Sequence, residues 1–583
     1  MRARASKDGV TLRVIAGSNN VLLAMDLNDA KRAGCLGFTI ERTDIETGDR
    51  RWLPNMLRFN ADSNAKGVTT ARAPLQKFRW GDYTVDPGRR YRYRAIARFG
   101  SAADIIREGT DAEQRHTFDS IPGGVVVEIK TENNRAQDAA VFFNRGAAAS
   151  KAYNDRFGNN DPKDIPEALS WLSRGLEEAA ITFMAQAIDS SFALHAAIYE
   201  FQKPELIAAL KAAKERGAQV NVVYHGRVKT GKGGKPDPKD KTTDRNKAAI
   251  AKQNIDFADP RAADPQAAIM HNKFVVLLRK DGGGTLVPIA AWTGSTNWTE
   301  GAIYGQLNVG HAIYDPQIAA KYEEYFKLLH RDLAAPDMKT QVSLLTPVPN
   351  SRDAIAHGIT PIFSPQSSLA MIDLYAELCK SAKVLMVSAP FALHPTIRAI
   401  LDAVPPPDAV RFLMADKEGS FGTTGEVELM QRAPGNEVSV ATVLNSALHD
   451  FQGGLLEDKE SFHHAGVHIH SKIIAADPFG ADPVIVTGSA NFSDNSTRTN
   501  DSNSLIIRGD TAVADVYATE FMRMFEHYWF RAHMEGKIAG GPAAAAGQDR
   551  VLGLREDSSW TDQYYEPGSR EMLDRRAFAG LAA

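Results

Sequence analysis

The segments "MHNKFVVLL" (residues 270–278) and "IHSKIIAAD" (469–477) decide how this chain is organised. Each holds a histidine, one intervening residue, a lysine and then a short apolar run. Each is followed by a second shared motif, "TGSTN" at 293–297 and "TGSAN" at 487–491. An ordered pair of motifs that occurs twice in one chain predicts an internal duplication.

The patterns of apolar residues around the two motif pairs also repeat, alternating between helical and strand periodicity. The segments expected in the first copy are 165–180 (helix), 191–201 (strand), 204–217 (helix), 219–226 (strand) and 317–332 (helix). The matching segments of the second copy are 368–382, 383–393, 394–403, 409–416 and 512–530. We therefore predict two tandem α/β lobes with an α/β/α layer arrangement, residues 125–343 and 354–535, related by a pseudo-twofold axis.

The residues before the first lobe read as β-strands separated by Gly, Asp and Asn turns, which predicts an all-β sandwich over 1–120. Within it, "YTVDPGRRYRYRAIARFG" (83–100) resembles a fibronectin type III strand preceded by its turn, with Tyr91 and Tyr93 alternating along the strand. The C-terminal tail, 536–583, starts with a Gly/Ala-rich stretch and then carries aromatic residues that we expect to dock on the body of the protein.

The motif residues form a set with a definite chemistry. Positions i and i+2 of a strand share a face, so the histidine and lysine of each motif point the same way. Packing the two lobes about a twofold axis would bring six polar side chains into one cleft: His271, Lys273, Asn297, His470, Lys472 and Asn491. Lysines and amides suit a phosphodiester, which carries one negative charge. One imidazole can attack phosphorus while the other protonates the leaving oxygen and then activates water.

The pattern H-x-K-x-x-x-x-D followed by G-S-x-N, present twice, resembles the phospholipase D superfamily. The second copy matches fully, with Asp477 as the motif aspartate, whereas Leu278 stands at that position in the first copy. The resemblance implies a metal-independent mechanism through a phosphohistidine, with the first histidine as nucleophile. It implies supporting roles for the motif serines Ser295 and Ser489 and for Asp477.

Members of this superfamily often carry a carboxylate roughly ten residues after the motif asparagine, where it orients a catalytic histidine. In the second copy Asp501 is the candidate for this role. In the first copy Gln306 and Asn308 are available, and a neutral side chain stabilises imidazolium less than a carboxylate does. We expect Asn308 or a carboxylate from elsewhere in the sequence to take the role.

Composition narrows the functional classes. The 583 residues carry a net charge of −3, so no overall basic field draws the protein to nucleic acid or anionic lipid. The two cysteines, Cys35 and Cys379, are predicted to be buried apolar residues rather than metal ligands. The histidines at 463, 464 and 468 crowd the second motif without the spacing of a zinc site. We expect neither a metal nor a cofactor.

Between Arg227 and Lys247 the chain holds eight Lys or Arg residues and three Asp. We interpret this segment as a basic loop, solvated or steering a polyanion into the cleft. No apolar window is long enough to span a bilayer, and the N-terminus lacks the apolar core of a secretory signal. We expect a cytoplasmic protein, with secretion as the alternative, and a monomer, because both half-sites lie in one chain.

The site chemistry does not select the substrate, since phospholipids and nucleic acids present the same diester. The fused copies and the absence of overall basicity favour a phospholipase D acting on a phospholipid head group. The basic loop and the short repeats favour the alternative, a nuclease. A third hypothesis is a non-catalytic protein that binds phosphodiesters.

Overall fold

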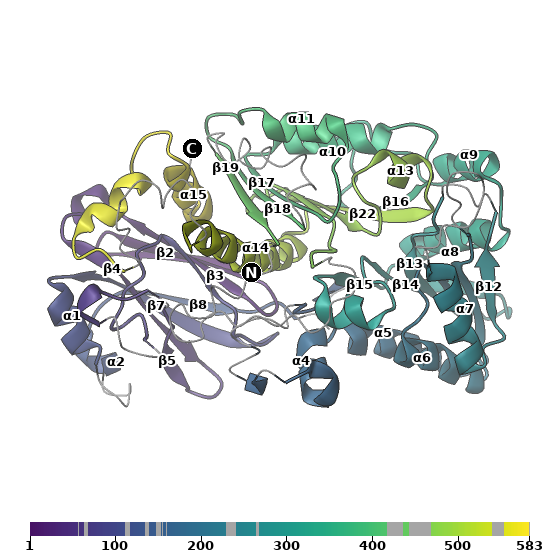
Figure 1. The fold of residues 1–583 in the computed structure, drawn as a ribbon, viewed down its shortest axis with the longest axis horizontal. Helices are drawn as coiled ribbons and strands as arrows, with labels where there is room; N and C mark the ends of the chain where they lie inside the picture. Colours follow the sequence, from purple (N-terminus) through teal and green to yellow (C-terminus); the bar gives the residue numbers. More distant parts are fainter. Residues whose placement is uncertain are drawn as a thin grey trace.

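A computed structural model describes residues 1–55, 57–62, 68–110, 117–133, 139–146, 153, 156–158, 160–228, 241–263, 268–416, 435–441, 468–538 and 553–581. An N-terminal β unit lies beside two α/β lobes, and the C-terminal segment returns to lie between the β unit and the second lobe (Figure 1). Among the described residues, no helix has both the length and the apolar character needed to cross a membrane.

The N-terminal unit consists of two four-stranded antiparallel sheets. One sheet has the order β1 (Arg2–Lys7), β2 (Val10–Ala16), β3 (Val21–Leu27), β6 (Arg79–Asp82), and the other has the order β5 (Arg50–Trp52), β4 (Cys35–Asp44), β7 (Arg90–Phe99), β8 (Val125–Lys130). Two short helices, α1 (Ala102–Glu108) and α2 (Thr117–Ser120), follow β7. Apolar side chains of both sheets, such as Leu23 and Tyr93, meet in one core.

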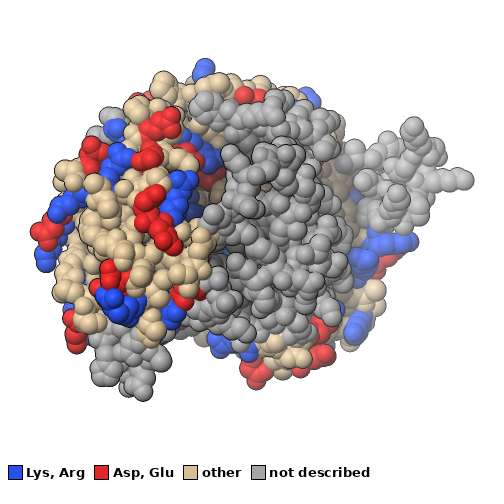
Figure 2. Space-filling model, turned by 60° about the vertical axis from the view of Figure 1, so that its left-hand side comes forward, with Lys and Arg blue, Asp and Glu red and all other residues tan. Residues whose placement is uncertain are grey.

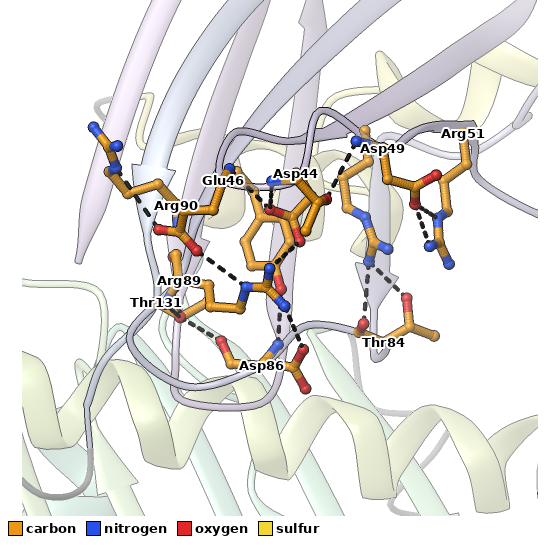
Figure 3. A network of polar contacts seen from close by, with 12 residues as sticks. Asp44, Glu46, Asp49, Arg51, Thr84, Asp86, Arg89, Arg90 and Thr131 are labelled. Atoms are coloured by element: carbon orange, nitrogen blue, oxygen red, sulfur yellow. Dashed lines mark hydrogen bonds and ion pairs between the residues drawn. The ribbon is translucent and has the colours of Figure 1, made fainter.

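The turn before β7, which carries the fibronectin-like pattern, is fastened by polar contacts (Figure 3). Arg89 lies 3.0 Å from both Asp44 and Glu46, so it ties the turn to the neighbouring strand β4 and the residues after it. The Asp86 N–H donates to the Tyr91 hydroxyl at 3.0 Å. The Thr131 hydroxyl donates to the Asp86 carbonyl at 2.6 Å. The alternation of Tyr91 and Tyr93 therefore places both rings inward, where each is at most 2% exposed.

Strand β8 corrects the predicted boundary of the first lobe. Residue 125 was expected to open that lobe, but β8 pairs with β7 along its whole length and belongs to the N-terminal sheet. Its alternating burial places Val125, Val127 and Ile129 in the core of the N-terminal unit. The first strand of the lobe is instead β9 (Ala139–Phe143).

The first lobe is built on a seven-stranded sheet with the order β12-β11-β10-β13-β14-β15-β9. Its elements after β9 are α4 (Pro166–Ser173), α5 (Leu176–Ala185), β10 (Phe192–Ile198), α6 (Pro204–Glu215), β11 (Gln219–His225), α7 (Thr242–Gln253), β12 (Ala258–Arg261), β13 (Lys273–Lys280), β14 (Leu286–Gly294), β15 (Val309–Ile313), α8 (Pro316–His330) and α9 (Ala335–Leu345). Helix α8 begins where the sequence pattern places it, because Pro316 opens it and the Asp315 side chain accepts two N–H groups of its first turn.

The second lobe repeats this arrangement. Its elements are β16 (Gly358–Ser364), α10 (Ala370–Ser381), β17 (Val384–Ala389), α11 (Pro395–Asp402), β18 (Val410–Ala415), β19 (Asn436–Val440), β20 (Ile473–Ala476), β21 (Val484–Gly488), α13 (Asp494–Arg498), β22 (Ser502–Arg508) and α14 (Thr511–Ile538). Its sheet order is β19-β18-β17-β20-β21-β22-β16, which matches the first lobe strand for strand when read in this direction. In both sheets the first two pairings are parallel and the other four are antiparallel.

Two local expectations differ from the structure. The helix predicted over 165–180 is broken into α4 and α5, because Arg174 and Gly175 take the left-handed conformation with φ of 50° and 90°. This break directs Arg174 to Glu520 of α14, 2.5 Å away, in a buried ion pair between the lobes. The basic loop predicted up to Lys247 ends earlier, since α7 begins at Thr242; residues 229–240 of that loop lie outside the described residues.

The lobes share one continuous apolar core. Phe274 of β13 and Tyr322 of α8 belong to the same cluster as Phe363 of β16 and Tyr517 of α14. The ring of Tyr325 stacks on that of Phe363 at 4.3 Å and 7°. A core of this kind fixes the two lobes against each other and therefore fixes any site that lies between them.

The C-terminal tail docks as its aromatic residues predict. It carries a 3-10 segment (Ser558–Tyr564) and α15 (Arg570–Ala579). The Trp560 indole stacks on Phe78 at 5.2 Å and donates to the Cys35 carbonyl at 2.8 Å, and Phe578 packs on Phe412 of the second lobe. The tail thus joins the N-terminal unit to the second lobe.

Candidate active site

The two H-x-K motifs meet between the lobes. His271 lies just before β13 and His470 just before β20, and their side chains are 4% and 5% exposed. Their ring centroids are 6.4 Å apart with 72° between the ring planes. The structure therefore brings together the two histidines that the repeat singled out.

Each histidine segment is held by the backbone of the other lobe. The His271 N–H donates to the Asp501 carbonyl at 2.7 Å, and the Asp501 N–H donates to Ile269 at 3.0 Å. In the reciprocal contact, Leu307 donates to His468 at 2.8 Å and accepts from the His470 N–H at 3.1 Å. Neither histidine can be placed by its own lobe alone.

The two motif lysines are buried beside the histidines. Lys273 Nζ donates to the His271 carbonyl at 2.6 Å, and Lys472 Nζ donates to the His470 carbonyl at 2.5 Å. Burial lowers the pKa of both ammonium groups well below 10.5. The charge of Lys273 lowers the pKa of Lys472 further, whereas Asp416 raises it. An anion bound between the lysines would stabilise their protonated forms and raise these pKa values.

The histidines are held in their neutral form. Burial lowers the pKa of each well below 6.5, and both lysines lower it further. His271 is also affected by the charge of His470. At neutral pH both rings of the unliganded protein are therefore uncharged.

The two rings differ in their Nδ1 partners. His470 Nδ1 lies 3.0 Å from Asn308 Oδ1 and 3.1 Å from the Ser295 carbonyl. Asn308 Nδ2 donates to the Ala302 carbonyl at 2.9 Å, which turns its oxygen toward the ring. Two acceptors at Nδ1 place the proton there and leave Nε2 with its lone pair.

His271 Nδ1 has no hydrogen-bond partner among the described residues. The Ser489 backbone raises the pKa of His271, although its contact with Nδ1 does not meet the geometry of a hydrogen bond. Ser502 occupies the position equivalent to Asn308, because each directly precedes the residue whose carbonyl accepts the N–H of the motif serine. The two histidines thus have unequal support.

The G-S-x-N turns shape the floor of the site. A Cβ on Gly294 would lie 2.1 Å from the Val309 carbonyl, and one on Gly488 would lie 2.4 Å from the Asn503 carbonyl, so only glycine allows the next strand to approach. The Ser295 hydroxyl accepts from Val309 N–H and the Ser489 hydroxyl from Asn503 N–H, each fixing the start of that strand. The motif serines therefore organise the backbone.

The two motif asparagines are available to a ligand. Asn297 is 7% exposed, and Asn491 is partly buried. The side-chain oxygen of each is buried without a hydrogen-bond partner among the described residues. An unsatisfied amide oxygen at the bottom of a site costs free energy until a ligand or water pairs with it.

Asp477 supports the strand rather than the chemistry. Its carboxylate accepts from the N–H groups of Lys383 and Val384 at 2.8 and 3.1 Å and pairs with Arg352 at 2.8 Å. Leu278, at the equivalent place in the first lobe, is buried in an apolar core. The loss of the motif aspartate there removes a backbone clamp and leaves the histidine and lysine in place.

Asp501 does not orient a histidine ring, which corrects one of the expected roles. Its carboxylate is 2.8 Å from Arg227 and 3.2 Å from Arg261, and all three side chains are at most 3% exposed. The role of orienting residue falls instead to Asn308, and it acts on the histidine of the opposite lobe. Arg227, counted in the basic loop, is thus a buried partner of Asp501 and not a surface cation.

Sequence reasoning missed the residues at the ends of β11 and β18. His225 Nδ1 accepts from Met270 N–H at 3.2 Å. At the matching place in the second lobe, Asp416 accepts from His468 and Ile469 N–H at 2.5 and 2.9 Å. Each therefore holds the segment that leads into a motif histidine. His225 is the last residue of β11 and Asp416 directly follows β18; site residues in α/β folds gather at the carboxyl ends of parallel strands.

Aromatic residues line the rim of the site. The Tyr199 ring lies 5.1 Å from that of His271, and Lys273 Nζ lies 5.0 Å from it. Phe391, which is 44% exposed, stands with its ring 6.5 Å from His470. Within the described residues, no three His, Cys, Asp or Glu side chains are grouped to hold a metal; positions 463 and 464 lie outside those residues.

Comparison with known proteins gives one family match, which covers part of the first lobe. Residues 184–330 match the family model described as "Cardiolipin synthase, PLD-like domain", and this segment includes the first motif pair. No curated protein sequence matches the chain.

Three solved structures show similarity at low identity. A polyphosphate kinase from Porphyromonas gingivalis matches at 12% identity and TM-score 0.39, over 60% of this chain and 45% of the kinase, so this chain spans less than half of it. A phosphatidylserine synthase from Haemophilus influenzae matches at 11% and 0.39, over 63% and 92%. The phospholipase D family member Nuc from Salmonella typhimurium matches at 21% and 0.20, over 26% and 88%. The family match assigns residues 184–330 to a PLD-like domain, and the motif pair within that segment recurs in the second lobe at 470–491.

Proposed function

We propose that this protein is a phosphodiesterase that hydrolyses its substrate through a phosphohistidine on His271, with His470 as general acid and base. The observation that carries the proposal is the pair of buried imidazoles 6.4 Å apart, flanked by two buried lysines. The matched strand orders and the reciprocal backbone contacts support a pseudo-twofold axis through the cleft.

The unequal support of the two rings favours this assignment. A nucleophile must be neutral, and burial together with the charges of both lysines and His470 lowers the pKa of His271, whose Nδ1 has no hydrogen-bond partner among the described residues. A general acid must hold a proton, and two acceptors at Nδ1 stabilise the imidazolium form of His470. Arrival of a phosphodiester monoanion raises the pKa of His470 and lets it take up the proton that it later donates.

The reaction then runs in two balanced steps. Nε2 of His271 forms a bond to phosphorus while the bond to the leaving oxygen breaks, and His470 gives its proton to that oxygen. Neutral His470 next removes a proton from water, whose oxygen attacks phosphorus as the phosphorus–nitrogen bond breaks. A phosphomonoester leaves and His271 is restored. Lys273, Lys472, Asn297 and Asn491 stabilise the charge on the non-bridging oxygens in both steps.

We propose a phospholipid head group as the favoured substrate. The family model that matches the first lobe is named for a lipid enzyme. The net charge of −3 gives no general attraction to nucleic acid. With both half-sites in one chain, we propose that the protein acts as a monomer.

A nucleic-acid substrate is the second candidate, favoured by one observation. The exposed Phe391 ring beside His470 can stack on a base, as aromatic residues do in proteins that bind single strands. Incubating the purified protein with phosphatidylcholine vesicles and with plasmid or single-stranded DNA, side by side, separates the candidates. Release of choline supports the first, cleavage of DNA supports the second, and binding of either without turnover would support the non-catalytic hypothesis.

A further inference from the structure

A cavity lies away from the cleft, lined by residues of the N-terminal unit, the second lobe and α15. Its volume is about 710 Å³. It opens beside Asp477, at the end of β20 opposite to His470, which is about 20 Å away along an extended strand. Its occupant cannot therefore touch the catalytic histidines.

The walls of this cavity carry an excess of positive charge. The five cations are Arg4, Arg13, Arg352, Lys383 and Arg576, and the three carboxylates are Asp408, Asp477 and Asp482. Two of the carboxylates already have partners: Asp477 pairs with Arg352 at 2.8 Å, and Asp482 pairs at 2.9 Å with Arg508, which is outside the lining. Figure 2 shows basic and acidic side chains interspersed on the described part of one face of the molecule.

Arg13 projects from β2 into this cavity. Its guanidinium donates to the carbonyls of Phe578 at 3.0 Å, Phe479 at 3.4 Å and Ala577 at 3.5 Å, and the described residues give it no ion pair. Burial and the charges of Arg2 and Arg4 lower its pKa, although Asp515 opposes them. The position therefore holds a cation whose charge is left largely uncompensated.

A glycine at the end of α15 leaves room for the Arg13 guanidinium. Gly580 closes α15 in the left-handed conformation with φ of 65°. A Cβ at that position would lie 2.8 Å from Arg13 NH1, so another residue would push the guanidinium aside. The floor beside it is apolar, with Phe479 and Leu573 in the lining. The cavity thus combines a convergent set of cations with an apolar floor.

We propose that this cavity is a binding site for a small organic phosphate monoester, separate from the catalytic cleft. A dianion with three terminal oxygens can accept hydrogen bonds from several walls at once, and the guanidinium forks of Arg13 and Arg4 match its geometry. The apolar floor accommodates the organic part. The proposal stands on the cavity alone and does not depend on the function proposed for the cleft.

Isothermal titration of the full chain with glycerol 3-phosphate tests the site, with succinate and sulfate as arms for a carboxylate and a simple inorganic anion. Because the cleft also binds phosphate groups, the titration compares wild type with Arg13→Gln and with Lys273→Gln. We expect two classes of binding event in wild type. Arg13→Gln should weaken, at least tenfold, the class of binding that Lys273→Gln retains.

Lys383→Gln is the second variant, because its exposed side chain can be replaced without disturbing the fold. It should weaken the same binding class several-fold. Arg92→Gln is the matched control, since Arg92 lies on the N-terminal unit outside the cavity, paired with Glu128, and should bind as wild type does. The proposal is overturned if wild type shows a single class that Lys273→Gln abolishes, or if Arg13→Gln and Lys383→Gln bind like Arg92→Gln. Diester hydrolysis, measured separately, reports on the cleft and is unaffected by either result.

Discussion

Replacing Asp501 by Asn tests whether the two lobes together place the nucleophile. The carboxylate is 1% exposed and neutralises Arg227 and Arg261, which come from the other lobe. Its own backbone carbonyl accepts the His271 N–H at 2.7 Å. The substitution keeps the shape of the side chain and removes its charge.

The expected loss of stability follows from the burial of these charges. Breaking a buried ion pair by removing one partner costs about 3–5 kcal/mol. The lower end applies because Arg261 keeps Asp332 at 2.7 Å, while Arg227 has no other carboxylate partner among the described residues. At about 2–4 °C per kcal/mol for a domain of this size, Tm should fall by roughly 6–12 °C.

The expected loss of activity is larger than misfolding alone would give. A displacement of the reacting group by about 1 Å can cost on the order of 100-fold in rate. Since His271 attacks whatever the leaving group, Asp501→Asn should lower kcat by a similar factor for p-nitrophenyl and alkyl diesters. Rates are measured well below the Tm of the variant and normalised to the amount of folded protein.

Glu520→Gln provides a matched control. Glu520 also forms a buried ion pair across the lobes, with Arg174 at 2.5 Å, and it lies on α14 away from the histidines. We expect it to lower Tm comparably and to keep kcat within about threefold of wild type, since no reacting group is displaced. Equal losses of kcat in both variants, or a normal kcat in Asp501→Asn, would show that the ion pairs stabilise the fold without placing His271.

The remaining predictions concern the chemistry of the cleft. Activity should survive EDTA, and complete loss that a divalent ion restores would contradict the lysine-based mechanism. His470→Ala should keep more activity on a p-nitrophenyl diester than on an alkyl diester, whereas His271→Ala should lose both; a phosphoryl group trapped on His470 would reverse the assignment. Because the pKa of His271 is lowered, the acid limb of kcat/KM should lie below pH 6.5. The free energy of unfolding should also decrease as the pH falls below 6.5, because His271 binds a proton in the unfolded chain but not in the folded one; thermal unfolding at several pH values measures this. Lys273→Met should abolish turnover yet raise Tm at pH 7, since a buried ammonium whose pKa is lowered costs stability there; a lower Tm would argue against that cost.

The repeat was enough to predict two lobes with matching sheets and to predict that His271 and His470 lie close together, whereas the roles of the six motif residues stay predictions. H-x-K and G-S-x-N are local patterns, and the rule that residues i and i+2 of a strand share one face does not depend on residues distant in sequence. The boundary at 125 was wrong because β8 has the alternating pattern of any half-buried strand, and the partner that decides its sheet, β7, is distant in sequence. The break at Arg174 was missed because Glu520, which forms an ion pair with the Arg174 side chain, lies in the other lobe.

The orienting residues show a deeper limit of comparing the copies by sequence. A search beside each histidine, within its own copy, led to Asp501 for the second and to Asn308 for the first. In the structure Asn308 contacts His470, and the equivalent Ser502 belongs to the lobe opposite His271. Each lobe therefore carries the support of the other lobe's histidine, and divergence of one copy alters the reactivity of the other. In this chain Asn308 stands at one of these positions and Ser502 at the other. His470 and His271 therefore have different surroundings and can specialise as acid and nucleophile, although their motifs are the same.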